Sequence, residues 1–168
     1  MSDVILVGLP GSGKTTAGRA VAEALQRSFV DTDDVFFELE HVSVQEYLRS
    51  FGEPKFRERE LLALRHALVN YDVVATGGGV VTTSEARALL SSELTVWLDC
   101  SDDVLVERVR GGDRPLLAGD VATRMRELRE QRGALYAVVS RSRVDTAGPL
   151  DDVTTELRGV IENAQTPS

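Results

Sequence analysis

The sequence predicts an α/β fold of three layers, α/β/α, in which helices cover both faces of a parallel β-sheet. Short apolar segments alternate with segments of helical periodicity along the chain, and this alternation is typical of parallel β-α-β units. A glycine-rich loop at residues 8–15 stands between the first apolar segment and a helical one. With 168 residues, 42% of them hydrophobic, the chain has the length of one domain and enough apolar side chains for its core.

Five short segments are expected to form the strands. Residues 4–7 are wholly apolar, as is typical of a strand at the centre of a parallel sheet. The other expected strands are residues 29–30, 73–75, 94–98 and 143–145. Ligands of such sheets bind at the carboxyl ends of the strands. Three polar segments that follow strands are therefore expected to meet there: residues 8–15, 31–34 and 77–79.

Helical periodicity, caps and breakers place the helices between these strands. Ser43 and Glu46 have the spacing of a capping box, and Ser101 is expected to cap a later helix. Residues 52–54 contain glycine and proline and are expected to separate two helices. The expected helices cover residues 14–27, 43–51, 55–69, 84–90, 101–110, 120–140 and 150–163.

Composition and charge argue against several classes of protein. The formal net charge of −8 is unfavourable for a general nucleic-acid binder, which would carry a basic face. The sequence has neither an apolar stretch long enough to span a membrane nor the pattern of a signal peptide. The single cysteine, Cys100, excludes an internal disulfide, so a cytoplasmic protein is expected. We expect no nucleic-acid or membrane partner, and a monomer.

Residues 8–15 read G-L-P-G-S-G-K-T and match the phosphate-binding loop pattern G-x-x-x-x-G-K-[ST]. The glycines let successive backbone N–H groups point at phosphate oxygens, and the following helix adds its positive N-terminal dipole. Lys14 is expected to reach the β- and γ-phosphates, and the Thr15 hydroxyl to ligate Mg²⁺. The loop therefore predicts a nucleoside triphosphate site. The other contacts expected there are Gly11, Ser12, Gly13 and Thr16.

Two aspartates, Asp31 and Asp33, follow the second expected strand. One interpretation is simple N-capping of the next helix. The other is functional: one carboxylate helps to hold Mg²⁺, directly or through water, and the other accepts a hydrogen bond from a substrate hydroxyl that attacks the γ-phosphate. Phosphoryl transfer needs mainly positioning and charge neutralisation, so an aspartate can orient the nucleophile without being a strong base.

Arg57 and a glycine triplet are candidate substrate contacts, each with an ordinary structural alternative. Arg57 stands three residues before Glu60 on an expected helix. The two form either a surface ion pair or a pair in which Glu60 aims the guanidinium at an anionic substrate. Gly77, Gly78 and Gly79 end an apolar strand, where they form a tight turn or bring the backbone close to a ligand. Beside a phosphate loop, the close approach is favoured.

Three further residues have a structural interpretation, and two of them also have a functional one. Asp99 follows an apolar strand and is either a metal-supporting aspartate or a cap of the next turn. Arg114 stands in a glycine-framed segment, residues 111–119, that is either a surface loop or a lid closing on ATP. Such a lid would deliver the arginine to the transferring phosphate and exclude water. Arg132 stands late in a helix, where arginine commonly compensates the helix dipole.

Taken together, and in this order, the motifs resemble those of the shikimate kinase family over about residues 3–160. The set comprises the phosphate loop, D-T-D at 31–33, F-R-x-x-E at 56–60, G-G-G at 77–79, R-P-L-L at 114–117 and R-x-x-L-Y at 132–136. Only the phosphate loop is specific by itself, but the ordered set is specific as a whole. The resemblance implies ATP-dependent phosphorylation of the 3-hydroxyl of shikimate in aromatic amino-acid biosynthesis.

The resemblance further implies a P-loop kinase fold with a five-stranded parallel sheet and a mobile lid. The whole chain, residues 1–168, would be one domain, with a substrate-binding region at about residues 32–60 and the lid at about residues 111–119. Asp33 would hold the substrate hydroxyls and orient the attacking one. Arg57 and Arg132 would bind the shikimate carboxylate, with the glycine triplet close by.

On the nucleotide side, the resemblance implies that Arg114 spans ATP and the acceptor. Thr15 would ligate Mg²⁺, and Asp31 would support the ion through water. The chain departs from some relatives before the lid and after the last strand, which leaves the adenine contacts open between neighbouring residues. The expected adenine contacts are Arg108 or Arg110, and Pro149.

Three other functions compete with this one. A related small-molecule kinase would act on a sugar acid such as gluconate or on a nucleoside monophosphate, but the two arginines and the glycine triplet favour a small hydroxylated carboxylate. A GTPase switch would need an N-K-x-D motif, and the only lysine outside the phosphate loop is Lys55, in a different context. A nucleotide-binding module without catalysis is disfavoured because Lys14 and Asp33 are both present.

Overall fold

The computed structural model describes residues 1–111 and 120–166. Its centre is a sheet of five parallel strands in the order β2-β3-β1-β4-β5. The strands are β1 (Val4–Val7), β2 (Phe29–Asp31), β3 (Val73–Ala75), β4 (Thr95–Asp99) and β5 (Ser142–Asp145). The predicted five-stranded parallel sheet is therefore confirmed, with strand bounds that differ from the expected ones by one residue at most.

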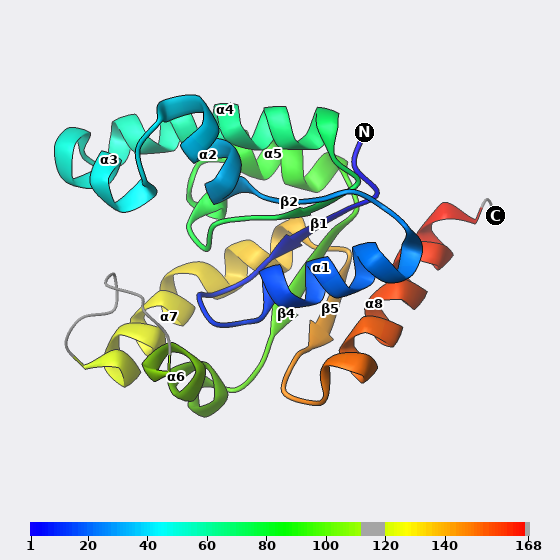
Figure 1. Cartoon of the computed structure of the whole chain (residues 1–168). Helices are drawn as coiled ribbons and strands as arrows, with labels where there is room; N and C mark the ends of the chain where they lie inside the picture. The colour runs from blue at the N-terminus through cyan, green and yellow to red at the C-terminus, as the bar shows by residue number, and fades with distance from the viewer. Residues whose placement is uncertain (112–119, 167–168) are drawn as a thin grey trace.

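Helices cover both faces of this sheet (Figure 1). They are α1 (Lys14–Leu25), α2 (Thr32–Glu40), α3 (Val44–Phe51), α4 (Glu53–Asn70), α5 (Ser84–Ser92), α6 (Asp102–Arg110), α7 (Val121–Val139) and α8 (Leu150–Gln165), with a 3₁₀ turn η1 (Val80–Thr82). Helices α1 and α8 pack together on one face, and α4, α5 and α7 cover the other. This is the predicted three-layer arrangement.

Alternating strand residues divide the apolar core into two buried clusters. Val4 and Leu6 of β1 point into one cluster, with side chains of α1 and α8. Ile5 and Val7 point into the other, with side chains of α2, α4, α5, α6 and α7. Side chains of a strand alternate between its two faces, so a strand with helices on both sides has to be apolar throughout, as β1 is.

Helix α2 was not among the expected helices. It begins directly after β2, and Asp31 caps it by accepting a hydrogen bond from the backbone N–H of Asp33 over 2.9 Å. Val35 and Phe36 are both buried, so the helix is held by packing. The capping interpretation of the aspartates at residues 31–34 was compatible with a helix here, and acidic residues in a first turn favour helix formation.

The break expected at residues 52–54 is shorter than predicted. Gly52 alone separates α3 from α4, with a φ of 82° that favours glycine. Glu53 and Pro54 belong to the first turn of α4. The backbone N–H groups of a first turn have no acceptor within the helix, so a proline there costs no helical hydrogen bond. The capping serines behave as expected: Ser43 accepts from Glu46 N, and Ser101 from Val104 N.

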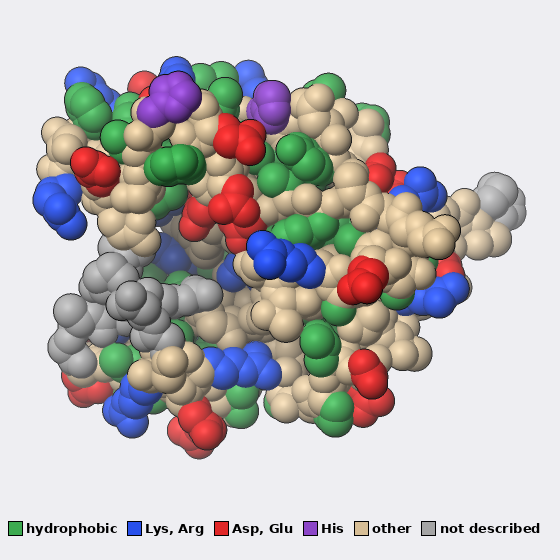
Figure 2. Space-filling model, viewed as in Figure 1, with side chains coloured by type: hydrophobic (Ala, Val, Ile, Leu, Met, Phe, Trp, Pro, Cys, Tyr) green, Lys and Arg blue, Asp and Glu red, His purple; other side chains and the backbone are tan. Residues whose placement is uncertain are grey.

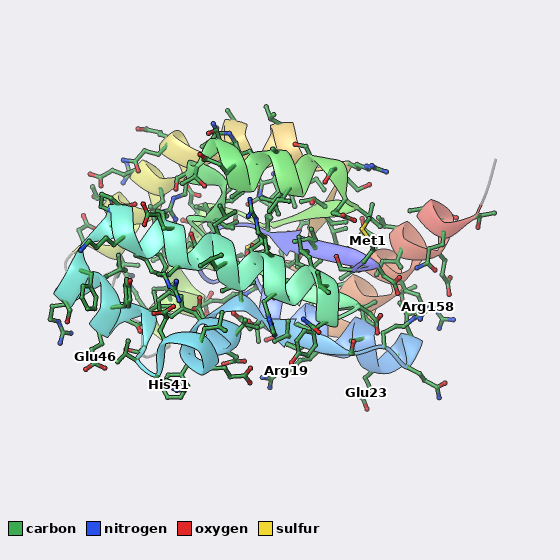
Figure 3. The ribbon with its side chains drawn as sticks, turned by 90° about the horizontal axis from the view of Figure 1, so that it is seen from above. Met1, Arg19, Glu23, His41, Glu46 and Arg158 are labelled. Carbon is green, nitrogen blue, oxygen red and sulfur yellow. The ribbon has the colours of Figure 1, made fainter. Side chains whose placement is uncertain are left out.

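The two histidines lie at the end of α2 and on α4, and among the described residues neither belongs to a group that could hold a metal ion. His41 ends α2, and Figure 3 shows it at the outer edge of the molecule, pointing away from the interior. His66 lies on α4, and no role was assigned to either from the sequence. Within residues 1–111 and 120–166, no helix combines the length and the apolar character needed to cross a membrane.

Candidate active site

A cleft of about 640 Å³ lies at the carboxyl ends of β1, β2 and β3. Helices α2 and α3 project on one side of this edge and α6 on the other (Figure 1), and the surface is hollowed between these parts (Figure 2). The residues lining the cleft are Pro10, Gly11, Gly13, Lys14, Thr15, Thr16, Asp31, Asp33, Val44, Gln45, Leu48, Glu53, Phe56, Arg57, Glu60, Thr76, Gly77, Gly78, Gly79, Thr82, Arg124, Leu128, Gln131 and Arg132. The predicted meeting of three polar segments is confirmed.

The phosphate-binding loop wraps around the amine of Lys14. This side chain is buried, and its Nζ donates hydrogen bonds to the carbonyls of Gly8 and Leu9 over 2.7 and 3.0 Å. Such curvature requires glycine: a Cβ at Gly8 would lie 2.3 Å from the Leu98 carbonyl oxygen, and Gly13 has a φ of 91°. The loop thus holds a positive charge at the entrance of α1, as an anion site requires.

Two residues outside the motif tie this loop to the rest of the fold. Thr146, just after β5, is buried and donates a hydrogen bond from Oγ1 to the Ser12 carbonyl over 2.7 Å. Arg108 of α6 donates to the carbonyls of Gly11 and Thr146 over 3.2 and 2.5 Å. Arg108 was expected near the nucleotide, whereas Thr146 was missed because nothing in its sequence context distinguishes it from a turn residue.

Thr15 and Asp31 lie side by side at the start of α1 and the end of β2. The Thr15 hydroxyl donates to Asp31 Oδ2 over 2.7 Å, while Oδ1 of the same carboxylate caps α2. The capping interpretation of Asp31 is confirmed, and the second oxygen of its carboxylate faces Thr15, where the metal role stays a prediction. Hydroxyl and carboxylate oxygens are suitable ligands for Mg²⁺, which is usually bound by one or two protein groups together with phosphates and water.

Asp33 carries the most strongly perturbed carboxyl group of the cleft. Its side chain can be reached by solvent, yet protein surrounds it on most sides. This burial, together with the carboxylates of Asp31 and Glu60, raises the pKa of Asp33 to about 6, against a smaller opposing effect of Lys14. A carboxyl with such a pKa can hold a proton in a site that operates near neutrality.

Arg57 and Glu60 form a buried ion pair at the floor of the cleft. Arg57 Nη1 donates to Glu60 Oε2 over 2.8 Å, and Nη2 pairs with Glu53 over 3.1 Å. Burial raises the pKa of Glu60, and the attraction of Arg57 offsets this only in part. Burial alone would lower the pKa of Arg57, but the paired carboxylates raise it. The surface-pair interpretation is wrong: Glu60 is 7% exposed and aims the guanidinium into the cleft.

The glycine triplet brings the backbone within contact distance of both arginines. A Cβ at Gly79 would lie 2.3 Å from Arg57 Nη2, and a Cβ at Gly78 would lie 3.3 Å from Arg132 Nη1. A side chain at Gly79 would therefore displace the Arg57 guanidinium, and one at Gly78 would crowd Pro10 and Arg132. The close-approach interpretation of the triplet is supported by these contacts, and Arg132 faces the cleft from α7 instead of compensating the end of its helix.

Asp99 has a structural role. Its carboxylate is 1% exposed and is held by Arg129 of α7 over 3.1 Å and by Arg143 of β5 over 2.5 Å. These residues lie beside a second, open hollow of about 460 Å³ at the ends of β4 and β5, lined by Cys100 among others. Because both oxygens are bound by guanidinium groups, the metal-supporting interpretation of Asp99 is not favoured.

Several expected site residues do not line this cleft. Arg110 is exposed in the last turn of α6, and Pro149 precedes α8. Arg114 and the R-P-L-L segment lie outside the described residues, as does most of the expected lid. The cleft also contains side chains of α3 and α7 that were not expected there from the sequence, among them Val44, Leu48, Arg124, Leu128 and Gln131. Their only sequence signal is helical spacing on one face.

Comparison with known proteins points to one family. A family model described as shikimate kinase matches residues 10–162. A shikimate kinase of Mycobacterium ulcerans (strain Agy99) is 45% identical over 145 residues, which cover 84% of this chain and 79% of that one. A shikimate kinase of Corynebacterium jeikeium (strain K411) is 38% identical over 96% of this chain and 89% of its own. The solved structure of a shikimate kinase from Acinetobacter baumannii in complex with shikimate has a TM-score of 0.89 and 30% identity, covering 98% of this chain and 94% of that one.

Proposed function

The chain belongs to the shikimate kinase family, and we infer that it transfers the γ-phosphoryl group of ATP to the 3-hydroxyl of shikimate. The observation that carries this function is the composition of a single cleft. It joins the phosphate-binding loop to Asp33 and to two arginines, Arg57 and Arg132, that approach the same glycine turn. A small carboxylate with hydroxyl groups is the acceptor that such a site would bind next to a triphosphate.

Arg57 and Arg132 bind the carboxylate of shikimate in this proposal, and the glycine turn lies against the same group. Planar guanidinium groups suit carboxylates because they donate paired hydrogen bonds. The pairing of Arg57 with buried Glu60 supports this assignment, since it holds the guanidinium in place before the substrate arrives. Arg132 is the second, partly exposed cation of the same end of the cleft.

Asp33 orients the attacking hydroxyl. The 3-oxygen forms a bond to the γ-phosphorus as the bond from that phosphorus to the bridging oxygen breaks; ADP leaves, and the hydroxyl proton passes to Asp33. Its pKa of about 6 allows this carboxyl to accept the proton and release it near neutral pH. Most of the barrier is lowered by positioning and by charge neutralisation, as is general for phosphoryl transfer.

Lys14 and the N-terminus of α1 neutralise the phosphates. The Lys14 amine is held by carbonyl oxygens of the loop itself, so the loop defines its position. The residues suited to hold Mg²⁺ are Thr15, directly, and Asp31, through water. When bound, the ion neutralises charge on the β- and γ-phosphates. The backbone of Gly11, Ser12, Gly13 and Thr16 completes the phosphate contacts of this proposal.

The remaining assignments follow from the family. We place Arg108 against the adenine, since its guanidinium already lies between the phosphate loop and Thr146, with Arg110 as the alternative and Pro149 on the opposite side. Arg114 contacts the transferring phosphate from a lid at residues 111–119. We propose that the chain acts as one domain over residues 1–168 and as a monomer. Its net charge of −8 and single cysteine favour a cytoplasmic enzyme without a nucleic-acid partner.

A coupled ADP-release assay with four acceptors tests this function. Shikimate should support turnover, whereas quinate, gluconate and AMP should support little. Arg132→Ala should raise the KM for shikimate at least tenfold and leave the KM for ATP within about twofold, because a guanidinium–carboxylate pair is lost on one side of the transferred group only. Arg126→Ala, an exposed arginine on the same helix that does not line the cleft, is the matched control. Turnover with shikimate no faster than buffer would refute the function.

A further inference from the structure

Residues 77–79 form the glycine turn, and only some of its backbone N–H and carbonyl groups have hydrogen-bond partners among the described residues. The Gly77 N–H donates to Thr32 Oγ1 over 3.3 Å, and the Gly77 carbonyl accepts from Val80 N over 3.2 Å. The Gly79 carbonyl accepts from both the backbone and the hydroxyl of Thr82. Among the described residues, the N–H groups of Gly78 and Gly79 have no hydrogen-bond acceptor. These two N–H groups are therefore the donors of the turn that can bind a ligand.

One side chain from the opposite layer holds this turn. Tyr136 of α7 is wholly buried, and its hydroxyl donates to the Gly78 carbonyl over 2.5 Å. The positive charge of Arg132, one helical turn earlier on the same face, acts on this hydroxyl and opposes the rise of its pKa. The Arg132 guanidinium also lies against Gly78. The phenol oxygen thus holds the glycine turn beside a guanidinium of the carboxylate site.

We propose that Tyr136 is a positioning residue for the acceptor: its hydroxyl fixes the Gly78 carbonyl beside the Arg132 guanidinium, so that this guanidinium and the backbone N–H groups of Gly78 and Gly79 face the same carboxylate. This inference rests on the proposed function and adds to it a residue that does not line the cleft. A carbonyl held on one side of a peptide unit directs the N–H of the next residue to the other side, because the unit is planar.

The chemistry of tyrosine suits this task. The hydroxyl has to donate to the Gly78 carbonyl, which a neutral phenol does and a phenolate does not. Burial raises the pKa of Tyr136 to about 12, although Arg132 opposes the shift, so the phenol remains a donor at any physiological pH. The ring is fixed as well, since it packs on Trp97 with 5.8 Å between centroids.

Tyr136→Phe tests the proposal, because it removes the hydroxyl and keeps the ring. The KM for shikimate should rise about tenfold, the effect of losing one buried hydrogen bond on binding. The KM for ATP and the kcat should change by less than about threefold. Tyr71→Phe is the matched control: Tyr71 caps the end of α4, does not line the cleft, and its substitution should leave every constant unchanged.

Direct binding supplies a second readout. Trp97 is the only tryptophan and packs on Tyr136, so its emission can report shikimate binding without ATP. The dissociation constant measured in this way should rise with the KM in Tyr136→Phe. Rates and binding are normalised to the folded fraction, measured by near-ultraviolet circular dichroism at low temperature, so that a loss of stability is not counted as a loss of affinity.

The outcomes separate this inference from the function on which it rests. A KM and dissociation constant for shikimate that do not change in Tyr136→Phe, while the unaltered chain phosphorylates shikimate, would overturn the positioning role alone. Equal losses for shikimate and ATP would also overturn it, since they indicate a general structural role. Failure of the unaltered chain to use shikimate would overturn the proposed function together with this inference.

Discussion

Individual residues of the cleft are held in states that favour function over stability. Asp33 is the clearest case, because its carboxylate stands close to those of Asp31 and Glu60 within a concave surface. Like charges in such a place disfavour the ionised form. Ionising Asp33 in the folded chain therefore costs free energy. A substrate hydroxyl that donates a hydrogen bond to the carboxylate would lower this free energy. Removing the charge should therefore have opposite effects on activity and on stability.

Asp33→Asn should lower turnover at least a hundredfold, the usual contribution of a general base or orienting carboxylate. The pKa of Asp33 is about 6 in the fold, against an ordinary value of 3.8. The folded chain binds this proton more tightly than the unfolded chain, so stability is lost as the pH rises from about 4 to about 6. The variant should exceed the unaltered chain in stability above that range, by about 1 kcal/mol or less after solvent screening.

Urea unfolding at about pH 8 and about pH 4 measures this difference. The gain should be present at the higher pH and absent at the lower one. Asp34→Asn, an exposed neighbour outside the cleft, should show neither the gain in stability nor the loss of turnover. A variant that is less stable than the unaltered chain at both pH values would show that Asp33 stabilises the fold.

Gly79 provides the second prediction at this scale. Its φ of −90° is open to any residue, so the obstacle to a side chain is Arg57, whose Nη2 would lie 2.3 Å from the new Cβ. Because that guanidinium ends a flexible side chain, Gly79→Ala should fold with a nearly unchanged melting temperature. It should raise the KM for shikimate at least tenfold, by displacing Arg57 from its place above the turn.

Steady-state kinetics and thermal unfolding on the same preparation test this expectation. Gly159→Ala is the control, since its new Cβ would meet nothing within 4 Å. If Gly79→Ala loses stability but keeps its affinity for shikimate, then the contact between the glycine turn and Arg57 serves the fold and not the substrate.

At the scale of elements, helix α7 connects the two halves of the site. Its face toward the cleft carries Arg132 and Leu128. One turn before Arg132, the side chain of Arg129 reaches the end of β4. Arg129 donates to Asp99 over 3.1 and 3.2 Å, to Asp102 over 2.6 Å and to the Cys100 carbonyl over 2.7 Å. The helix is thus anchored to the sheet at the level of the site.

Arg129→Met should lower the free energy of unfolding by about 2 kcal/mol, because it leaves the buried carboxylate of Asp99 with Arg143 as its remaining charged partner. Denaturation in urea measures the change. Arg158→Met on α8 is the control: both partners of its pair with Glu162 are about half exposed, and such a pair contributes little. Equal midpoints for the two variants would show that Arg129 does not anchor α7.

The elements also show where sequence patterns succeed and where they do not. Strand β1 and helix α1 were predicted closely, because a wholly apolar strand and a glycine-rich loop each have one physical explanation. Helix α2 was missed because Val35 and Phe36 are its only buried apolar side chains, which is too few for a periodicity to be recognised. Packing against α4 decides that this segment is helical.

At the scale of the whole molecule, strand order explains how distant residues form one site. Strand β3 lies between β2 and β1, although it follows both in the sequence. The residues after β1, β2 and β3 therefore meet at one edge of the sheet, and α7 adds Arg132 from nearly a hundred positions beyond Asp33. The predicted convergence depended on the rule that parallel strands present their carboxyl ends together. The rule does not say which side chains touch.

The sequence by itself determined the α/β class, the phosphate-binding loop and the set of polar residues from which the site is built. These depend on local chemistry, since a pattern such as G-x-x-x-x-G-K-T or an apolar strand has the same meaning wherever it stands. Only the tertiary structure showed that Glu60 is buried against Arg57 and that Asp99 is held by Arg129 and Arg143, and only it brought Tyr136 and Thr146 to the site. Burial, pairing and the pKa of a carboxyl depend on neighbours from other elements, and those neighbours are set by packing and strand order, which no local pattern contains.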